Sequence, residues 1–359
     1  MAEGLVRLAL RIHHVRAARP HAGAMLGVFV GLLVALAVPT VAFADAAGPT
    51  DFESTIVAVT PPTEGVRFSI EGGDSFVRVD VEPGHEVLVL GYAPDHEPYL
   101  RITADSVEEN VRSYATYYNQ DRYGRSAIPD LVDTTAAPEW RRVGDGGTWA
   151  WHDHRAHWMG DEPPINLEPL DALPDQSIDV LVDGRPVSVV VRTVLQPDPS
   201  ILPSIVGALL GIQLGAIAMV LGRATSTMTV LVGGIGAIVV GGAEYLSLPA
   251  ATGPLVTWWL LPAISVGCAS VTIAVYARSE LVEIGLLALG GVMLLLWTTQ
   301  RRAVFGAAIL PTSLPFWVDR LVSAAAGVIG LFAVVTAGRA LARLVTSPEP
   351  PSSAAAHAP

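Results

Sequence analysis

The stretch that decides the fold reads ILPSIVGALLGIQLGAIAMVLG, residues 201–222. It has no charged residue, and as a helix it is long enough to cross the ~30 Å hydrocarbon core of a bilayer. The composition changes abruptly here, from a segment rich in Asp, Glu and Pro to one rich in Leu, Val, Ala and Gly. The change predicts two parts, an extracytoplasmic domain over 45–199 and a transmembrane helical bundle over 200–345.

Further apolar segments follow, and we expect about five membrane-spanning helices in all. They are predicted at 201–222, 228–246, 255–277, 281–299 and 318–340. Arg223, Arg278 and Arg339 follow the first, third and fifth segments, which indicates that these connections and the C-terminus are cytoplasmic. The protein is therefore expected in the cell membrane as a multi-pass protein.

Arg301 and Arg302 fall on the outer side in this topology, and the segment 300–317 is either a loop or a re-entrant segment. Glu244 is expected near the outer end of the second helix, on the same side as the two arginines. Because an unpaired acid at the bilayer edge is costly, Glu244 should pair with one of them.

The chain begins with a pattern typical of a secretory signal peptide. Four arginines precede an apolar run from Ala22 to Ala44, which ends in the A-x-A motif Ala42-Phe43-Ala44. We predict a signal peptide over 1–44, with an uncleaved anchor as the alternative because the apolar run is long. Either way, the residues after Asp45 lie outside the cytoplasm. The end of the chain, 346–359, is expected to be a disordered cytoplasmic tail.

The exported domain is strongly acidic, with 28 acidic residues against 11 arginines over 45–200. This balance argues against nucleic acid or anionic lipid as a partner and is compatible with attracting cations, with a solvated, soluble surface as the simpler explanation. The single cysteine, Cys268, lies in the third apolar segment, so the exported domain has no disulfide and no thiolate ligand for a metal.

The exported domain is predicted to be all-β, a sandwich or a partly closed barrel. Its Val- and Ile-rich runs are short and bounded by Gly, Pro and Asp. The runs are Ser54–Val59, Val66–Ile70, Phe76–Val81, Glu86–Tyr92, Tyr99–Ile102, Ile178–Val182 and Pro186–Leu195. Two less regular segments, 113–147 and 160–175, are expected to be long surface loops that flank one more strand, at 148–158.

That last strand carries the candidate chemistry, WAWHDHRAHWM at 149–159. On a strand, His152 and His154 share one face, and His157 faces away unless a bulge or turn re-aims it. Imidazoles two residues apart can converge on one ion, and Met159 adds a thioether. Histidine with methionine suits copper, and three histidines suit zinc or copper. The candidate metal ligands are therefore His152, His154, His157 and Met159.

The alternative is a metal-free structural network. Asp153 and Arg155 could form ion pairs, the imidazoles could bond loop backbones, and the indole N–H groups could cap carbonyls. The function is then either copper or zinc binding and hand-over, or a structural or partner-docking role. The sequence shows no G-x-S-x-G, no H-E-x-x-H and no phosphate-binding glycine loop, so we expect neither an enzyme nor an organic cofactor.

Small residues indicate close helix packing in the membrane part. Gly207, Gly211 and Gly215 recur every four residues and form a ridge on one helix face. The ridge either packs within the bundle or forms a homo-oligomer interface. A membrane or extracytoplasmic protein partner of unknown identity is also expected.

Several motifs carry a resemblance to a known group. In order, they are Gly91-Tyr92, EPYLRI at 97–102, Asn119, Arg122-Tyr123-Gly124, Pro138-Glu139-Trp140 and WHDHRAHWM at 151–159. The chain resembles exported multi-pass membrane proteins of high-GC Gram-positive bacteria, a resemblance that implies no particular activity. Its plan is also similar to copper-handling proteins that join a copper-resistance sandwich domain to a membrane domain. Asp45 at the expected mature start departs from their pattern, because it supplies no N-terminal histidine.

Overall fold

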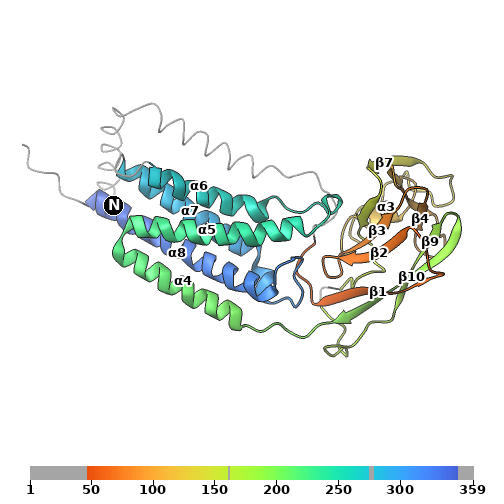
Figure 1. Ribbon diagram of the computed structural model, residues 1–359, viewed down its shortest axis with the longest axis horizontal. Coiled ribbons are helices and arrows are strands. Elements are labelled where there is room, and N and C mark those ends of the chain that lie inside the picture. Colours follow the sequence, from red (N-terminus) through yellow and green to blue (C-terminus); the bar gives the residue numbers. More distant parts are fainter. Residues whose placement is uncertain (1–46, 161, 275–278, 347–359) are drawn as a thin grey trace, which may run out of the picture.

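The protein consists of a β-rich part followed by five long helices. The structure is a computed structural model that describes residues 47–160, 162–274 and 279–346. The helices lie side by side at one end of the molecule and the strands form the other (Figure 1). The predicted fold class, an all-β domain followed by a helical bundle, is confirmed. The predicted signal peptide, Arg278 and nearly all of the predicted tail lie outside the described residues.

In the described residues, ten strands form two antiparallel sheets. They are β1 (Phe52–Thr60), β2 (Val66–Glu71), β3 (Phe76–Val81), β4 (Glu86–Leu90), β5 (Pro98–Thr103), β6 (Val107–Asn110), β7 (Trp140–Gly144), β8 (Thr148–Trp151), β9 (Gln176–Val182) and β10 (Arg185–Leu195). The larger sheet has the order β1-β10-β9-β4-β5-β6-β7, and the smaller has the order β2-β3-β8. Side chains of both sheets share one buried core, so the domain is a sandwich.

The alternation of side chains explains why the predicted strands form. In β10, Val187, Val189 and Val191 are buried and the residues between them are less so. All seven predicted runs are strands. The predicted loop 113–147 also contains the short helix α3 (Ala115–Tyr118) and the edge strand β7. The sequence of β7, WRRVG, is too polar to stand out as a strand.

Five long apolar helices lie where the membrane-spanning helices were predicted. They are α4 (Leu202–Leu221), α5 (Arg223–Leu246), α6 (Thr257–Ala274), α7 (Glu280–Gln300) and α8 (Phe316–Thr346). Each is long and apolar enough to cross a membrane. The helix α8 ends at the end of the bundle that is far from the β domain (Figure 1). The segment 300–317 is a loop with a 3₁₀ turn, η2 (Arg302–Phe305), and it lies against the β domain.

The glycine ridge of α4 packs against α8. A Cβ at Gly207 would collide with the carbonyl oxygen of Leu321, and one at Gly211 would lie 2.8 Å from the carbonyl oxygen of Ala325. The close approach of the two backbones therefore requires glycine at these positions. The glycine face of α4 was expected either to pack within the bundle or to form a homo-oligomer interface, and it is covered by α8 of the same chain.

A buried group of charges joins three helices at the β-domain end of the bundle. Arg301 forms an ion pair with Glu244, as predicted, and a second pair with Asp319, in which its Nη2 contacts both carboxylate oxygens at 2.8 and 2.7 Å. The Arg301 guanidinium also lies over the ring of Trp297, 4.9 Å from its centre. All three charged side chains are buried. The cluster ties the end of α7 to α5 and α8.

The turn between β2 and β3 lies at the contact between the sandwich and the helical bundle. Gly72 and Gly73 adopt φ angles of +69° and +81°, which favour glycine. A side chain at Gly72 would meet Leu248, and one at Gly73 would meet Ile309. Thr50 and Ile309 also exchange two backbone hydrogen bonds, of 3.0 and 2.8 Å. The sandwich is therefore docked on the loops that connect the helices.

Candidate metal centre

The Trp/His segment leaves the sheet earlier than predicted. Strand β8 ends at Trp151, so the predicted strand over 148–158 is wrong beyond that residue. Asp153 causes the break: its Oδ1 accepts the backbone N–H of Arg155 (3.1 Å) and its carbonyl accepts the N–H of Ala156 (2.9 Å). An aspartate that bonds its own backbone two residues on favours a turn over a strand. The turn changes the direction of every side chain after it.

A buried ion pair fixes this turn in place. The Arg155 guanidinium bonds both carboxylate oxygens of Asp153, each at 2.8 Å. It also donates to the carbonyls of Leu90 and Gly91 at the end of β4. The indole N–H of Trp151 donates to Asp153 at 3.1 Å. Burial acts to raise the pKa of Asp153, but the Arg155 charge and these hydrogen bonds hold that pKa below its usual value.

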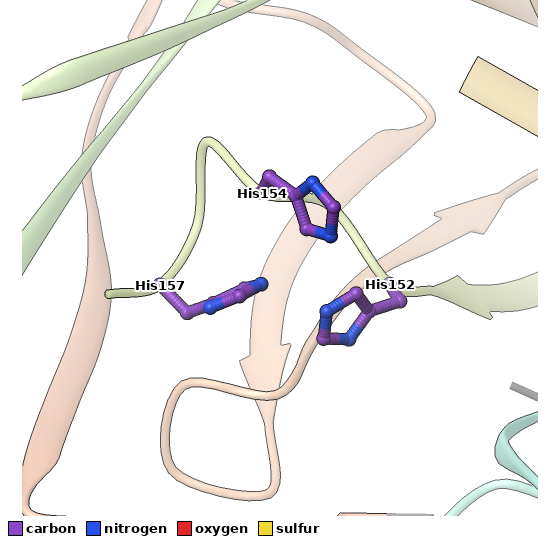
Figure 2. A group of neighbouring side chains, drawn as sticks. All are labelled: His152, His154 and His157. Atoms are coloured by element: carbon purple, nitrogen blue, oxygen red, sulfur yellow. The ribbon is translucent and has the colours of Figure 1, made fainter. Parts of the chain in front are cut away.

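The turn brings His152, His154 and His157 together; we call these residues the histidine triad. Figure 2 shows the three rings turned towards one another along the loop that follows β8. Ring nitrogens, one from each histidine, all lie within 4.8 Å of one another. The side chains are buried, with exposed fractions of 4, 8 and 6%. His157, expected to face away in a strand, joins the other two because of the turn.

Each imidazole of the triad is oriented by a hydrogen bond to the backbone. The partners are Ser75 for His152, the Asp121 carbonyl for His154 (2.9 Å) and the Trp158 carbonyl for His157 (2.9 Å). The other nitrogen of each ring has no hydrogen-bond partner among the described residues: Nε2 of His152, Nδ1 of His154 and Nε2 of His157. Because a neutral imidazole that donates through one nitrogen accepts through the other, three lone pairs are left for an occupant.

The triad is electrically neutral at ordinary pH. Burial lowers the pKa of His152 to about 3 and that of His157 to about 2, and it also lowers the pKa of His154. Repulsion from the other imidazoles and from the Arg122 guanidinium acts in the same direction on His152 and His157. Neutral imidazole is the form that binds metals.

Aromatic rings pack around the triad and restrict its movement. Phe76 meets His152 edge-on, with 5.9 Å between ring centres, and Tyr118 meets His154 edge-on at 4.3 Å. The Tyr92 hydroxyl accepts the backbone N–H of His154 at 3.1 Å. The packing leaves the rings few alternative positions.

One candidate ligand, Met159, and one neighbouring ion pair, Asp74 with Arg122, lie outside the histidine triad. Met159 is half-buried two residues after His157, and its role as a ligand stays a prediction. Asp74 and Arg122, which form a buried ion pair at 2.5 Å beside the triad, were missed by the sequence analysis. They come from the β2–β3 turn and from the loop after α3, and nothing in their spacing connects them to the Trp/His segment.

The chain matches none of the family models, curated proteins or solved structures with which it was compared.

Proposed function

We propose that this protein is a membrane-anchored metal-binding protein whose exported β domain holds a copper or zinc ion through the histidine triad. The observation that carries the proposal is the set of three unpartnered nitrogens on buried, neutral rings. A buried polar atom without a partner costs about 1–3 kcal/mol. Three of them on rings that lie together are best explained by a common occupant. The backbone bonds on the opposite nitrogens orient the rings as outer-shell partners of metal-bound histidines do.

The spacing of the nitrogens fits an ion after a small contraction. Metal–nitrogen bonds of 2.0–2.1 Å place tetrahedral ligands about 3.3 Å apart. The nitrogens now lie within 4.8 Å of one another, so each pair has to close by about 1.5 Å at most. Because aromatic rings pack around the triad, only small rotations about the side-chain torsions are open to the imidazoles, and the loop has to move with them.

We further propose capture or hand-over of the ion on the outer face of the membrane, with the C-terminus in the cytoplasm. The acidic surface of the exported domain attracts cations. A membrane or extracytoplasmic protein would then receive or supply the ion. The sequence carries no recognised catalytic motif, and binding rather than catalysis is the proposed role.

A metal-free structural role is the second candidate, and one observation favours it. The Asp153–Arg155 pair already pins the turn to β4 through Leu90 and Gly91. The loop could therefore keep its shape with no ion. Metal binding by the intact protein separates the two candidates.

The test uses full-length protein purified in detergent, stripped with a chelator and titrated with Zn²⁺ or Cu⁺ against a chromophoric competitor. We expect one ion per chain for the wild type, and loss of that binding in His152→Ala, His154→Ala and His157→Ala. The control is His85→Ala, because His85 lies on the surface and bonds Asp183 at 2.8 Å. Its binding should equal that of the wild type.

The structural candidate predicts a different pattern. A ligand that binds only the folded state must raise the melting temperature. If the segment is structural, neither ion would raise the melting temperature of the wild type. The three alanine variants would still melt lower than the wild type because they lose buried contacts. That pattern would reject the metal proposal.

A further inference from the structure

Asp74 is a second buried group in the exported domain with an unpartnered atom. Its side chain is fully buried, and its Oδ2 accepts hydrogen bonds from Arg122 (2.5 Å) and Thr50 (3.2 Å). Its Oδ1 has no hydrogen-bond partner within the described part of the chain. The backbone N–H of Asp74 donates to the Gly72 carbonyl at 3.1 Å and also acts on its own carboxylate, and burial raises the pKa of that group. An orphan oxygen on a buried carboxylate indicates a missing donor or cation.

The β2–β3 turn places Asp74 beside the first histidine of the triad. Ser75, the next residue, hydrogen-bonds the His152 ring through its backbone. Phe76, one residue further, packs against the same ring with 5.9 Å between centres. The two residues that follow Asp74 therefore both contact His152.

A second connection reaches the triad from the loop after α3. Arg122 holds Oδ2 of Asp74, and its preceding residue, Asp121, accepts the ring N–H of His154 through its carbonyl. Asp74 is thus joined to two of the three histidines by separate routes. Four unpartnered atoms, one carboxylate oxygen and three imidazole nitrogens, belong to this one region.

We propose that Oδ1 of Asp74 is the fourth ligand of the ion held by the histidine triad, so that the site is a three-histidine, one-carboxylate centre for Zn²⁺. This inference rests on the proposed metal-binding function. Three neutral imidazoles and one carboxylate form a donor set with a charge of −1, which suits a divalent cation with tetrahedral geometry. A site completed by the Met159 thioether would instead suit Cu⁺.

The geometry requires the turn to move with the rings. Asp74 does not belong to the group of atoms that lie within 4.8 Å of one another, so its Oδ1 has to approach as the site contracts. Arg122 and Thr50 both hold Oδ2, which leaves Oδ1 to bind in a monodentate manner. Arg122 keeps its contact with Oδ2, so the guanidinium and the ion share the one negative charge of Asp74.

The test measures Zn²⁺ and Cu⁺ affinity of the full-length protein for Asp74→Asn and Met159→Leu. We expect Asp74→Asn to weaken Zn²⁺ binding by more than the roughly 10- to 100-fold that loss of an outer-shell partner costs. Met159→Leu should leave Zn²⁺ binding unchanged. The matched control is Asp80→Asn, an acid on the adjacent strand that pairs with Arg78 and should bind Zn²⁺ as the wild type does.

A spectroscopic readout separates a ligand from a positioning residue. Co²⁺ in a tetrahedral site absorbs strongly in the visible range, and the bands depend on the ligands. We expect the Co²⁺ spectrum to change in Asp74→Asn. Asp74→Glu keeps the negative charge and serves as the second variant if Asp74→Asn does not fold, and its spectrum should change as well. Unchanged spectra in both, or a loss of Zn²⁺ affinity in Met159→Leu as large as in His152→Ala, would overturn the role of Asp74. Loss of all binding in the wild type would instead reject the proposed function itself.

Discussion

At the scale of single residues, Asp153 decides where the Trp/His segment leaves the sheet. Its carboxylate is fully buried and binds Trp151 and the Arg155 side chain, together with the backbone N–H of Arg155. β3 begins at Phe76, so pairing with β3 could extend past Trp151 by one residue only, and the turn at Asp153 directs His157 towards His152 and His154. One aspartate therefore sets both the shape of the loop and the convergence of the triad.

The first prediction follows from the burial of this pair. Asp153→Ala leaves the Arg155 guanidinium buried without its carboxylate, which should cost about 3–5 kcal/mol of unfolding free energy and abolish metal binding. The measurement is denaturant unfolding of the purified protein, followed by fluorescence. Asp175→Ala is the control, because Asp175 and Arg192 form an exposed pair and its loss should leave the midpoint unchanged. Equal midpoints in both variants would contradict the role of Asp153.

A second prediction concerns pH. The folded pKa values of His152 and His157, about 3 and about 2, lie below the ordinary value of 6.5, so the unfolded chain binds more protons. The stability of the metal-free protein should be constant above pH 6.5 and fall towards pH 3, by about 1.4 kcal/mol per pH unit for each of these histidines. Thermal melts across this range measure the slope. His157→Gln should reduce the slope; an unaltered slope would mean that His157 is solvated.

At the scale of elements, the sequence predicted what depends on local pattern and missed what depends on tertiary contacts. The alternating valines of β10 and the long apolar helices follow from burial of side chains. The end of β8 could not be predicted, because Asp153 and Arg155 form a turn only when the carbonyls of Leu90 and Gly91 are there to receive the guanidinium. The convergence of the triad depends on that turn, so the sequence placed His152 and His154 together on one strand face and could name His157 only as a ligand that a turn would have to re-aim.

The buried charges of the bundle show the same division. The pairing of Glu244 with Arg301 was predicted because topology places both at one end of the bundle. Asp319 was missed, because its contact with Nη2 of Arg301 depends on how α7 and α8 pack. Sequence order alone does not indicate which face of α8 carries Asp319.

The third prediction ranks these two acids. Asp319→Asn leaves Arg301 paired with Glu244 alone and removes the acid whose two oxygens both contact Nη2, which should cost about 3–5 kcal/mol. Glu244→Gln leaves Arg301 paired with Asp319, and its cost should be smaller, about 1.5–3 kcal/mol. Melting temperatures of the two variants in the same detergent give the order. If Glu244→Gln were the more damaging of the two, the dominant pair would be the one with α5.

At the scale of the whole molecule, the candidate metal centre and the junction with the membrane bundle share the same residues. Phe76 packs on His152 and also belongs to a buried cluster with Ala150, Leu248 and Trp258. Asp74 bonds Thr50, whose backbone pairs with the α7–α8 loop. An ion that holds the triad and the β2–β3 turn together would therefore also tighten the docking of the sandwich on the helices.

The last prediction tests this connection by amide hydrogen exchange of the full-length protein in detergent. Zn²⁺ at 100 times its dissociation constant stabilises the folded state by about 2.7 kcal/mol, and we expect slower exchange in 72–76 and in 307–313 because both segments belong to the same docked unit. The β9–β10 hairpin at Val182–Arg185 lies on the other sheet and serves as the internal control. His157→Ala is the binding-deficient variant, and in it Zn²⁺ should change the exchange of neither 72–76 nor 307–313. Protection from exchange that is confined to 150–158 would show that the ion orders only its own loop and that metal binding does not stabilise the junction with the bundle.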